Sequence, residues 1–343
     1  KDQEAVLLSN LNPEEPPLPV IFGIEGEKLT AAEKKFFKEV NPTGFILFKR
    51  NCKDPKQLKK LTAELQKLLG REVPILIDQE GGRVQRMCPP EWKQYEPMES
   101  YGDDFLRDFS KGRKALQEVT QSMSTELVDA GINVNCAPVL DVQFPETHQA
   151  IGDRAFSNDP EVVSILGITM SEEFLKHGIV PVIKHLPGQG RANQDSHKDL
   201  PVVTAELKDL RKADFEPFRE LLTKAFSEAV WGMVSHIIYQ ELDERAPASC
   251  SRRVIHETIR GDIGFKGLLL SDDISMGALD SIGNVAQRAE KVLRSGCDIA
   301  LHCNGDLEEM KAIAQRLKHQ KMTNEAVMRY NRTVEWLQTN LKP

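Results

Sequence analysis

Short apolar runs alternate along the chain with longer segments of helical pattern. Most of the runs are continuously apolar, as is typical of strands whose two faces are both covered in a parallel sheet. Eight runs are candidate strands, at residues 20–24, 44–48, 73–77, 134–139, 179–183, 232–234, 267–270 and 298–301.

The segments between the runs carry helix end signals. Thr30 and Glu33 have the spacing of a capping box, in which each residue satisfies a backbone N–H of the first turn. Asp54 precedes a proline at the start of a leucine-striped segment, and Gly70 is placed to end that segment. Thr204 is expected to cap a further helix. Each strand is therefore expected to be followed by a helix.

Strand and helix alternating eight times predicts an α/β fold, a (β/α)8 barrel of the TIM type. A doubly wound open sheet is the alternative, and periodicity alone does not separate the two. The count of eight and the lack of a phosphate-binding glycine fingerprint after the first strand favour the barrel. No Pro-, Gly- or Ser-rich linker divides the sequence, so we expect residues 1–343 to form one catalytic barrel domain, with 320–343 a C-terminal helix packed on its outside.

The composition excludes several classes of protein. The 343 residues carry 52 acidic and 45 basic side chains and a net charge of −7, which gives no basic stripe for nucleic acid. No apolar run approaches the roughly 20 residues that span a bilayer. None of the six cysteines forms a CxxC pair, so we expect reduced, mostly buried thiols. The sequence thus indicates a cytoplasmic monomer with a small-molecule substrate and no nucleic-acid or membrane partner.

Polar and charged side chains follow most of the candidate strands. In a barrel of this type the carboxyl ends of the strands hold the active site, and charges there are costly unless they line a polar cavity. The residues in these positions are Asp78, Asp141, Lys184, His185, Ser235, His236, Asp272, Asp273 and His302. A shared polar pocket is therefore expected at that end.

Two pairs of residues suggest acid/base and nucleophilic chemistry. Neighbours on a strand point to opposite sides, so only one of Asp272 and Asp273 is expected to face the pocket. Asp195 and His197 project to the same side of an extended loop, where the carboxylate could orient the imidazole. An Asx-turn beside a solvent-exposed histidine is the alternative interpretation of the second pair.

Metal and nucleotide chemistry are weaker alternatives. His185, His236 and His302 could join aspartates in a metal site, but no HxH or HExxH spacing occurs. The glycine pairs at 81–82 and 188–190 match neither a P-loop nor a dinucleotide fingerprint. We expect no metal and no cofactor.

Residues 78–86 (DQEGGRVQR), 184–190 (KHLPGQG), 195–197 (DSH) and 271–276 (SDDISM) together form a specific signature. With it the chain resembles glycoside hydrolase family 3, and within that family the single-domain bacterial β-N-acetylglucosaminidases of peptidoglycan recycling. Matching motifs begin near Phe22 and continue past Cys297, so the resemblance covers nearly the whole chain.

The resemblance implies a retaining exo-enzyme that removes terminal N-acetylglucosamine from β-1,4-linked anhydro-N-acetylmuramic acid, with or without its peptide. By the family pattern, Asp272 is the nucleophile, His197 the acid/base and Asp195 its partner. The residues that match the family's sugar-binding positions are Asp78, Arg86, Arg154, Lys184 and His185.

One position departs from the family pattern. The family loop usually reads KHFPGHG, whereas this chain has Gln189 in place of the second histidine. That histidine is not the acid/base, so catalysis should survive. A metal-dependent hydrolase on the same barrel and an inactive sugar-binding protein are the two rival hypotheses.

Overall fold

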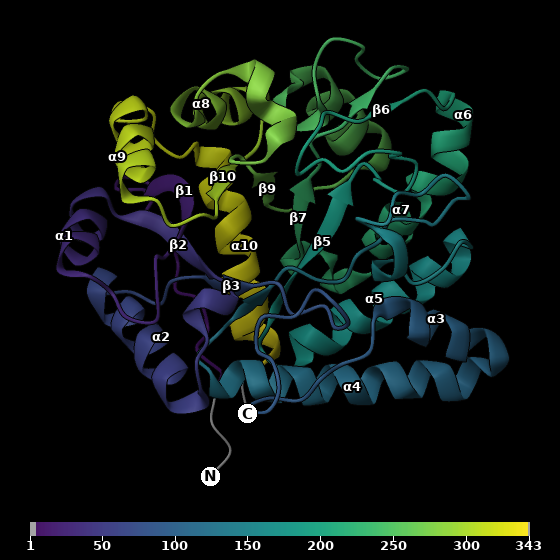
Figure 1. The fold of residues 1–343 in the computed structure, drawn as a ribbon, viewed down its shortest axis with the longest axis horizontal. Coiled ribbons are helices and arrows are strands. Elements are labelled where there is room, and N and C mark those ends of the chain that lie inside the picture. Colours follow the sequence, from purple (N-terminus) through teal and green to yellow (C-terminus); the bar gives the residue numbers. More distant parts are fainter. Residues whose placement is uncertain (1–4, 342–343) are drawn as a thin grey trace.

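Eight parallel strands close into a barrel that is ringed by helices (Figure 1). The structure is a computed structural model and describes residues 5–341. Around the barrel the strand order is β1-β10-β9-β7-β5-β4-β3-β2. The strands are β1 (Leu18–Gly23), β2 (Pro42–Leu47), β3 (Ile75–Ile77), β4 (Val134–Asn135), β5 (Val180–Leu186), β7 (Trp231–Val234), β9 (Leu269–Asp273) and β10 (Ile299–His302). The predicted (β/α)8 barrel is confirmed.

Helical segments connect the strands and cover the outside of the barrel. They include two π-helical segments, η3 and η6, which sequence periodicity does not reveal. The main segments are α1 (Ala31–Val40), α2 (Pro55–Leu69), α3 (Met98–Arg107), α4 (Phe109–Asp129), α5 (Pro160–Lys176), α6 (Leu207–Asp209), η3 (Leu210–Asp214), α7 (Glu216–Leu222), η6 (Val254–Ile263), α8 (Val285–Ser295), α9 (Leu307–Arg316) and α10 (Asn324–Asn340).

Most of the predicted helix ends are confirmed. Thr30 and Glu33 form both hydrogen bonds of the capping box, Asp54 caps α2, and Gly70 ends that helix in the left-handed region. The expectation for Thr204 is wrong, because Glu206 occupies the N-cap position of α6. The two residues before Thr204 form strand β6, which holds the chain extended up to that point.

The strands at the site differ from the predicted ranges in ways that matter for function. β4 is shorter than expected and ends at Asn135, where the N–H of Ala137 donates to the carbonyl of Asn135 instead of to a neighbouring strand. β5 extends to Leu186, so Lys184 and His185 lie within the strand. β9 begins later than expected and runs to Asp273. Two further short strands, β6 (Val202–Val203) and β8 (Ile238–Tyr239), pair outside the barrel.

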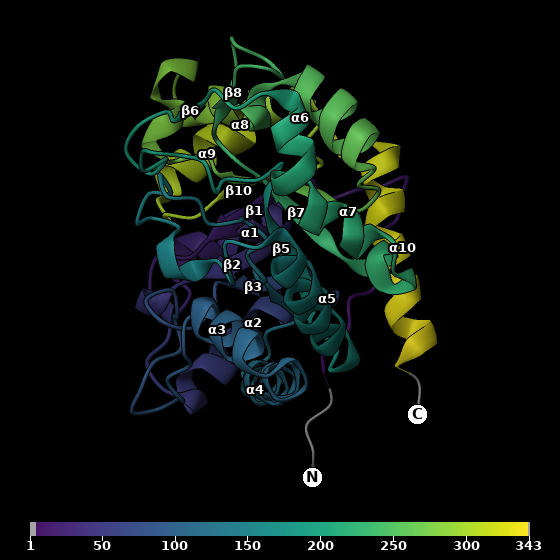
Figure 2. The same ribbon diagram turned by 90° about the vertical axis from the view of Figure 1, so that its right-hand side faces the viewer.

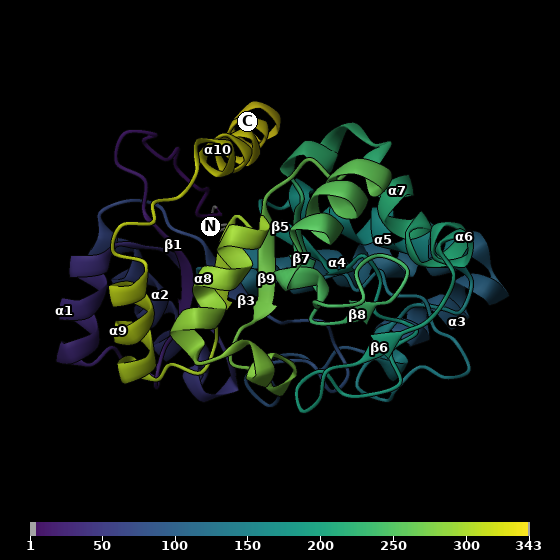
Figure 3. The ribbon, with the colours of Figure 1, turned by 90° about the horizontal axis from the view of Figure 1, so that it is seen from above.

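The C-terminal helix α10 lies against the outside of the barrel, on the side of α7 (Figure 2). Figure 3 places β6 and β8 on the opposite side of the molecule from α10. Residues 342 and 343 of the helix expected over 320–343 lie outside the described residues. The indole N–H of Trp231 donates to Thr333 Oγ1 at 2.9 Å, which ties α10 to β7. That the whole chain forms one catalytic domain stays a prediction.

An aspartate at the start of β10 joins three elements at the amino-terminal face of the barrel. Asp298 accepts hydrogen bonds from Arg260 of η6 at 2.9 Å, from Arg329 of α10 at 2.7 Å and from the backbone N–H of Leu269 at 2.8 Å. Its side chain is almost fully buried. A charge-assisted junction of this kind fixes the outer helices on the strands.

Two sequence expectations concern the wider surface and core. All six cysteines are free, and Cys136, Cys250, Cys297 and Cys303 are buried, in agreement with the expectation of mostly buried thiols. No helix within residues 5–341 combines the length and the apolar character that a membrane crossing needs.

Candidate active site

A cavity of about 430 Å³ opens where the carboxyl ends of the barrel strands meet. Asp78 follows β3 directly, Lys184 and His185 belong to the end of β5, and Asp272 belongs to the end of β9. Connecting loops supply the remaining lining. The structure brings all eight residues predicted for the site to this one cavity: Asp78, Arg86, Arg154, Lys184, His185, Asp195, His197 and Asp272.

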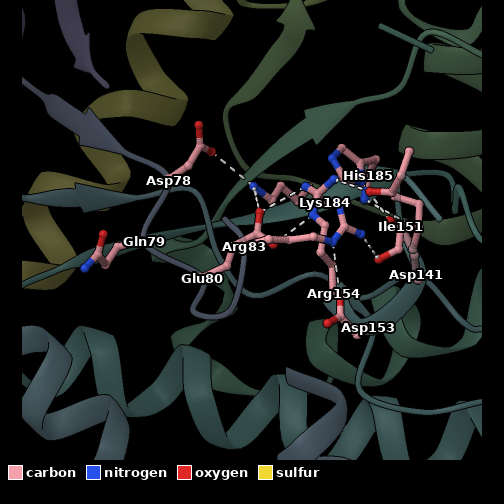
Figure 4. A network of polar contacts seen from close by, with 12 residues as sticks. Asp78, Gln79, Glu80, Arg83, Asp141, Ile151, Asp153, Arg154, Lys184 and His185 are labelled. Carbon is pink, nitrogen blue, oxygen red and sulfur yellow. Dashed lines mark hydrogen bonds and ion pairs between the residues drawn. The ribbon is translucent and has the colours of Figure 1, made fainter. Parts of the chain in front are cut away.

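A network of buried charges forms one wall of the cavity (Figure 4). The ammonium of Lys184 lies 2.7 Å from Glu80 and 3.1 Å from Asp78. Arg154 forms a bidentate contact with the carboxylate of Glu80, at 2.9 and 3.0 Å. Arg86 reaches Asp78 at 3.4 Å. The network therefore presents fixed donors and acceptors with little net charge, which suits recognition of neutral hydroxyl and amide groups.

The pKa values of the two carboxyl groups in this network reflect their partners. Burial alone would raise the pKa of Glu80, but Arg154 and Lys184 outweigh burial and lower it to about 2. Asp78 is buried as well, and Lys184 and Arg86 lower its pKa to about 2. Both carboxylates are consequently ionised throughout the pH range in which the folded protein would operate.

His185 is held in a fixed orientation by a carboxylate behind it. Its Nδ1 lies 2.7 Å from Asp141 Oδ2, and its backbone N–H donates to Asp141 Oδ1 at 3.1 Å. Asp141 is fully buried and also accepts the backbone N–H of Gln189 at 2.8 Å. The carboxylate favours the tautomer with a proton on Nδ1, so Nε2 of His185 is available as an acceptor.

Asp195 and His197 form the contact that their spacing predicted. His197 Nδ1 lies 2.8 Å from Asp195 Oδ1, and the same oxygen accepts the backbone N–H of His197 at 3.0 Å. The second bond is that of an Asx-turn, so this segment contains both the carboxylate–imidazole contact and the turn. Burial acts to raise the pKa of Asp195, but both contacts with His197 outweigh it and lower that pKa. The side chain of His197 is 63% exposed and lines the cavity.

Both aspartates at the end of β9 border the cavity, so the expectation that only one would reach it is wrong. The pairing of β9 with β10 shifts register here, which breaks the strict alternation of side chains. Asp273 is nonetheless the structural member of the pair, because its carboxylate accepts from Ser275 Oγ at 2.7 Å and from the backbone N–H of Cys303 at 3.2 Å.

The carboxylate of Asp272 is held ionised beside three imidazoles. Its burial acts to raise its pKa, but His185, His236 and His197 outweigh burial, and the pKa lies below the ordinary value. His236 contacts Ser249 Oγ at 2.6 Å and the backbone carbonyl of Asp273 at 2.9 Å. Burial lowers the pKa of His236, and this imidazole braces the strand end from behind through its contact with the backbone of Asp273.

Several residues have roles at the site that the sequence did not predict. Glu80 lies two positions after Asp78, and that spacing was the available signal for a second carboxylate on the same side. Asp141 follows β4, but its role behind His185 depends on a contact across 44 residues. Phe48 lines the cavity between the guanidiniums of Arg50 and Arg86, at 5.0 and 5.1 Å from its ring centre. No sequence signal distinguishes it from a core phenylalanine.

The other two strand-end histidines lie apart from the cavity lining. His236 stands behind Asp273, and His302 Nε2 contacts Glu309 at 3.1 Å. Within residues 5–341, no group of three His, Cys, Asp or Glu side chains is arranged to hold a metal ion.

A closed barrel whose mouth combines an ionised aspartate, an imidazole–carboxylate pair and fixed donors for hydroxyl groups has the fold and site of a glycosidase. Residues 15–337 match the Glycosyl hydrolase family 3 N terminal domain, and the chain belongs to this family. The resemblance predicted from the motifs is thereby confirmed, and the protein is a glycosidase.

Similar proteins extend the match over most of the chain. A protein named Beta-hexosaminidase from Neisseria meningitidis serogroup B is 36% identical over 293 residues, which are 85% of this chain and 80% of that protein. One of the same name from Bordetella avium is 34% identical over 289 residues, covering 84% and 81%. The crystal structure of NagZ from Neisseria gonorrhoeae in complex with N-trifluoroacetyl-D-glucosamine has a TM-score of 0.83 at 31% identity, covering 97% of this chain and 95% of that one.

Proposed function

We propose that this glycosidase is a retaining exo-β-N-acetylglucosaminidase. Its substrate in this proposal is N-acetylglucosamine β-1,4-linked to anhydro-N-acetylmuramic acid, with or without peptide, and its setting is peptidoglycan recycling. One observation carries the proposal: Asp272 and the Asp195–His197 pair line the same cavity. The names of the relatives and the N-acylglucosamine bound in the gonococcal structure support the choice of sugar.

In the first half-reaction Asp272 is the nucleophile. Its carboxylate oxygen forms a bond to the anomeric carbon while the bond from that carbon to the leaving oxygen breaks. His197, in its protonated form, gives its proton to the leaving oxygen. The lowered pKa of Asp272 keeps the nucleophile ionised under conditions in which an imidazole can still carry a proton.

In the second half-reaction water replaces the leaving group. His197, now neutral, takes a proton from the water as its oxygen bonds to the anomeric carbon, and the bond to Asp272 breaks. Two inversions at the same carbon give net retention. Asp195 supports both steps, because its carboxylate orients the imidazole through Nδ1 and stabilises the imidazolium form.

The charge network supplies the sugar-binding groups in this proposal. Asp78, Arg86, Arg154 and Lys184 offer acceptors and donors to hydroxyl and acetamido groups, and His185 offers Nε2. Glu80 already holds Lys184 and Arg154 in place, and Asp141 holds His185. Little rotamer freedom is therefore lost when sugar binds. The proposal also takes the enzyme to be a cytoplasmic monomer, without metal, cofactor, nucleic-acid or membrane partner.

Replacing the nucleophile tests the proposal directly. The wild-type protein should release the phenol from an aryl N-acetyl-β-glucosaminide, and strong chelator should not reduce the rate. Asp272→Asn should lower turnover by several orders of magnitude, whereas Asp129→Asn, at an exposed helix end, should leave turnover unchanged. A slow fluorinated substrate should leave one hexosamine unit on Asp272, detected by peptide mass spectrometry.

Five results would contradict the proposal. An inert wild-type protein would exclude the activity, and loss of activity in chelator would favour the metal-dependent rival. Near-normal turnover of Asp272→Asn, or an adduct on another residue, would show that the nucleophile is misassigned. Turnover of GlcNAc–anhydro-N-acetylmuramic acid that is slower than that of other β-linked N-acetylglucosaminides would remove the link to peptidoglycan recycling.

A further inference from the structure

We propose that the loop carrying the acid/base is docked on the turn that directly follows the nucleophile, and that Gly277 and Gln189 are the positioning residues of this dock. The loop is residues 195–198, called the dyad loop here, and the turn is residues 274–278. This inference rests on the roles proposed above for Asp272 and His197. It assigns a function to Gly277, which directly follows the 271–276 motif.

The two segments meet through their backbones. The N–H of Gly277 donates to the carbonyl oxygen of His197 at 2.8 Å, and the N–H of Ala278 donates to that of Ser196 at 3.2 Å. A β-carbon at position 277 would lie 2.6 Å from the carbonyl oxygen of Lys198 and 2.9 Å from that of His197. The φ angle of Gly277 is not in the left-handed region, so close approach is what requires the glycine.

A side-chain contact holds the dyad loop from the other direction. Ser196 is 2% exposed although the side chain of His197 is 63% exposed, so the loop has a buried anchor beneath an open imidazole. Gln189 Nε2 donates to Ser196 Oγ at 3.2 Å. The backbone N–H of Gln189 donates to Asp141, the carboxylate that also orients His185. A continuous set of hydrogen bonds thus links a sugar-binding residue to the dyad loop.

The amide of Gln189 has one atom that no residue within 5–341 satisfies. Its Oε1 is buried without a hydrogen-bond partner, and Gln189 lines the cavity. An unsatisfied buried acceptor is costly, and a site retains one where a ligand or a moving group can reach it. Whichever way the amide is turned, Ser196 uses one end of it and the other end has no partner among the described residues.

The turn that receives the dyad loop is itself rigidly held. Arg288 of α8 donates to the backbone carbonyls of Ile274 at 3.0 Å and Met276 at 3.3 Å and pairs with Asp280 at 2.9 Å. At its other end the turn continues directly from β9, which carries Asp272. The position of His197 relative to the nucleophile is therefore fixed by a short, well-held turn and not by a long loop alone. Small misplacements of a catalytic group reduce rates strongly, so this contact should affect the rate of proton transfer.

Adding one methyl group at position 277 tests the dock. Gly277→Ala should displace the dyad loop and weaken proton transfer, while the nucleophile stays in place. For a substrate with a poor leaving group, such as an alkyl N-acetyl-β-glucosaminide, kcat/KM should fall about tenfold or more. For a dinitrophenyl glycoside, which needs little protonation, kcat/KM should fall less than about threefold. Gly26→Ala is the matched control, because a β-carbon there meets nothing within 4 Å, and both substrates should be unaffected.

The side-chain contact has its own test. Gln189→Leu and Ser196→Ala should each lower kcat/KM more for the poor leaving group than for the dinitrophenyl glycoside. The double variant should be no worse than the more affected single variant, because each of the three variants removes the same hydrogen bond. Gln66→Leu, in a glutamine whose amide pairs with the backbone of Val73 away from the cavity, should show no leaving-group dependence.

The outcomes separate this inference from the proposed function. Equal losses on both substrates, or no loss on either, would overturn the dock, as would additive effects of the Gln189 and Ser196 variants. Should Gly277→Ala lack a cooperative unfolding transition, the Gln189→Leu result decides alone. The proposed function fails separately, if the wild type does not hydrolyse the dinitrophenyl glycoside or if Asp272→Asn remains active.

Discussion

Replacing Glu80 by glutamine would leave two buried cations without their shared counter-charge. The carboxylate is 2% exposed and contacts Lys184 at 2.7 Å and Arg154 at 2.9 Å. Its pKa of about 2, against an ordinary 4.5, corresponds to about 3 kcal/mol of folding stability at neutral pH. That agrees with the roughly 3–5 kcal/mol lost when one member of a buried ion pair is removed.

The dependence on pH distinguishes this ion-pair effect from a packing defect. A lowered pKa in the folded state contributes stability that is complete above the unfolded value and is lost as the pH falls toward the folded value. The gap between wild type and Glu80→Gln should therefore stay near about 3 kcal/mol from pH 6 to 8 and shrink to about 2 kcal/mol at pH 3.5. Denaturation by urea at each pH, with global fits of the unfolding free energy, measures the gap.

An exposed carboxylate provides the control for Glu80→Gln. Glu118→Gln removes an exposed carboxylate of α4 whose contact with Lys114 is 4.0 Å long, and its unfolding free energy should hardly change. Should Glu80→Gln lose less than about 1 kcal/mol at pH 7, or show a gap that does not depend on pH, the charge network would not be held together as described.

Two further predictions concern protons. His197→Ala should reduce kcat/KM most for poor leaving groups, and an equal reduction for an activated aryl group would argue against a proton-donor role. Burial raises the pKa of Asp214 to about 6 although Arg191 lies 2.8 Å away, so the ionised form costs stability as the pH rises through this range. Relative to wild type, Asp214→Asn should therefore gain about 2 kcal/mol between pH 4 and pH 8 in unfolding experiments, and parallel stability curves would refute the assignment.

The barrel could be predicted from the sequence because each strand is a continuous apolar run and several helix ends carry local signals. The capping box of Thr30 and the left-handed Gly70 need only neighbouring residues for their effect. The contact between Asp195 and His197 is equally local, since two residues of separation place both side chains on one side. Such features depend on short-range geometry, which the order of residues determines.

The parts that escaped prediction depend on distant segments. Glu80 meets Arg154 across 74 residues, and nothing near either residue marks the other as its partner. Gly277 matters because a loop some 80 positions earlier comes to rest on it. Thr204 has the right chemistry for a cap, but the pairing of β6 with β8 decides where the next helix begins. Tertiary contacts, not local preference, settle these positions.

Asp298 and the candidate active site occupy opposite ends of the same barrel. At one end a single carboxylate binds η6, β9 and α10 together. At the other end the loops and strand ends line the candidate active site. Selection can thus alter substrate preference at the barrel mouth without changing the contacts of the amino-terminal face. Stabilising substitutions can likewise be placed on the amino-terminal face, far from the reacting bond.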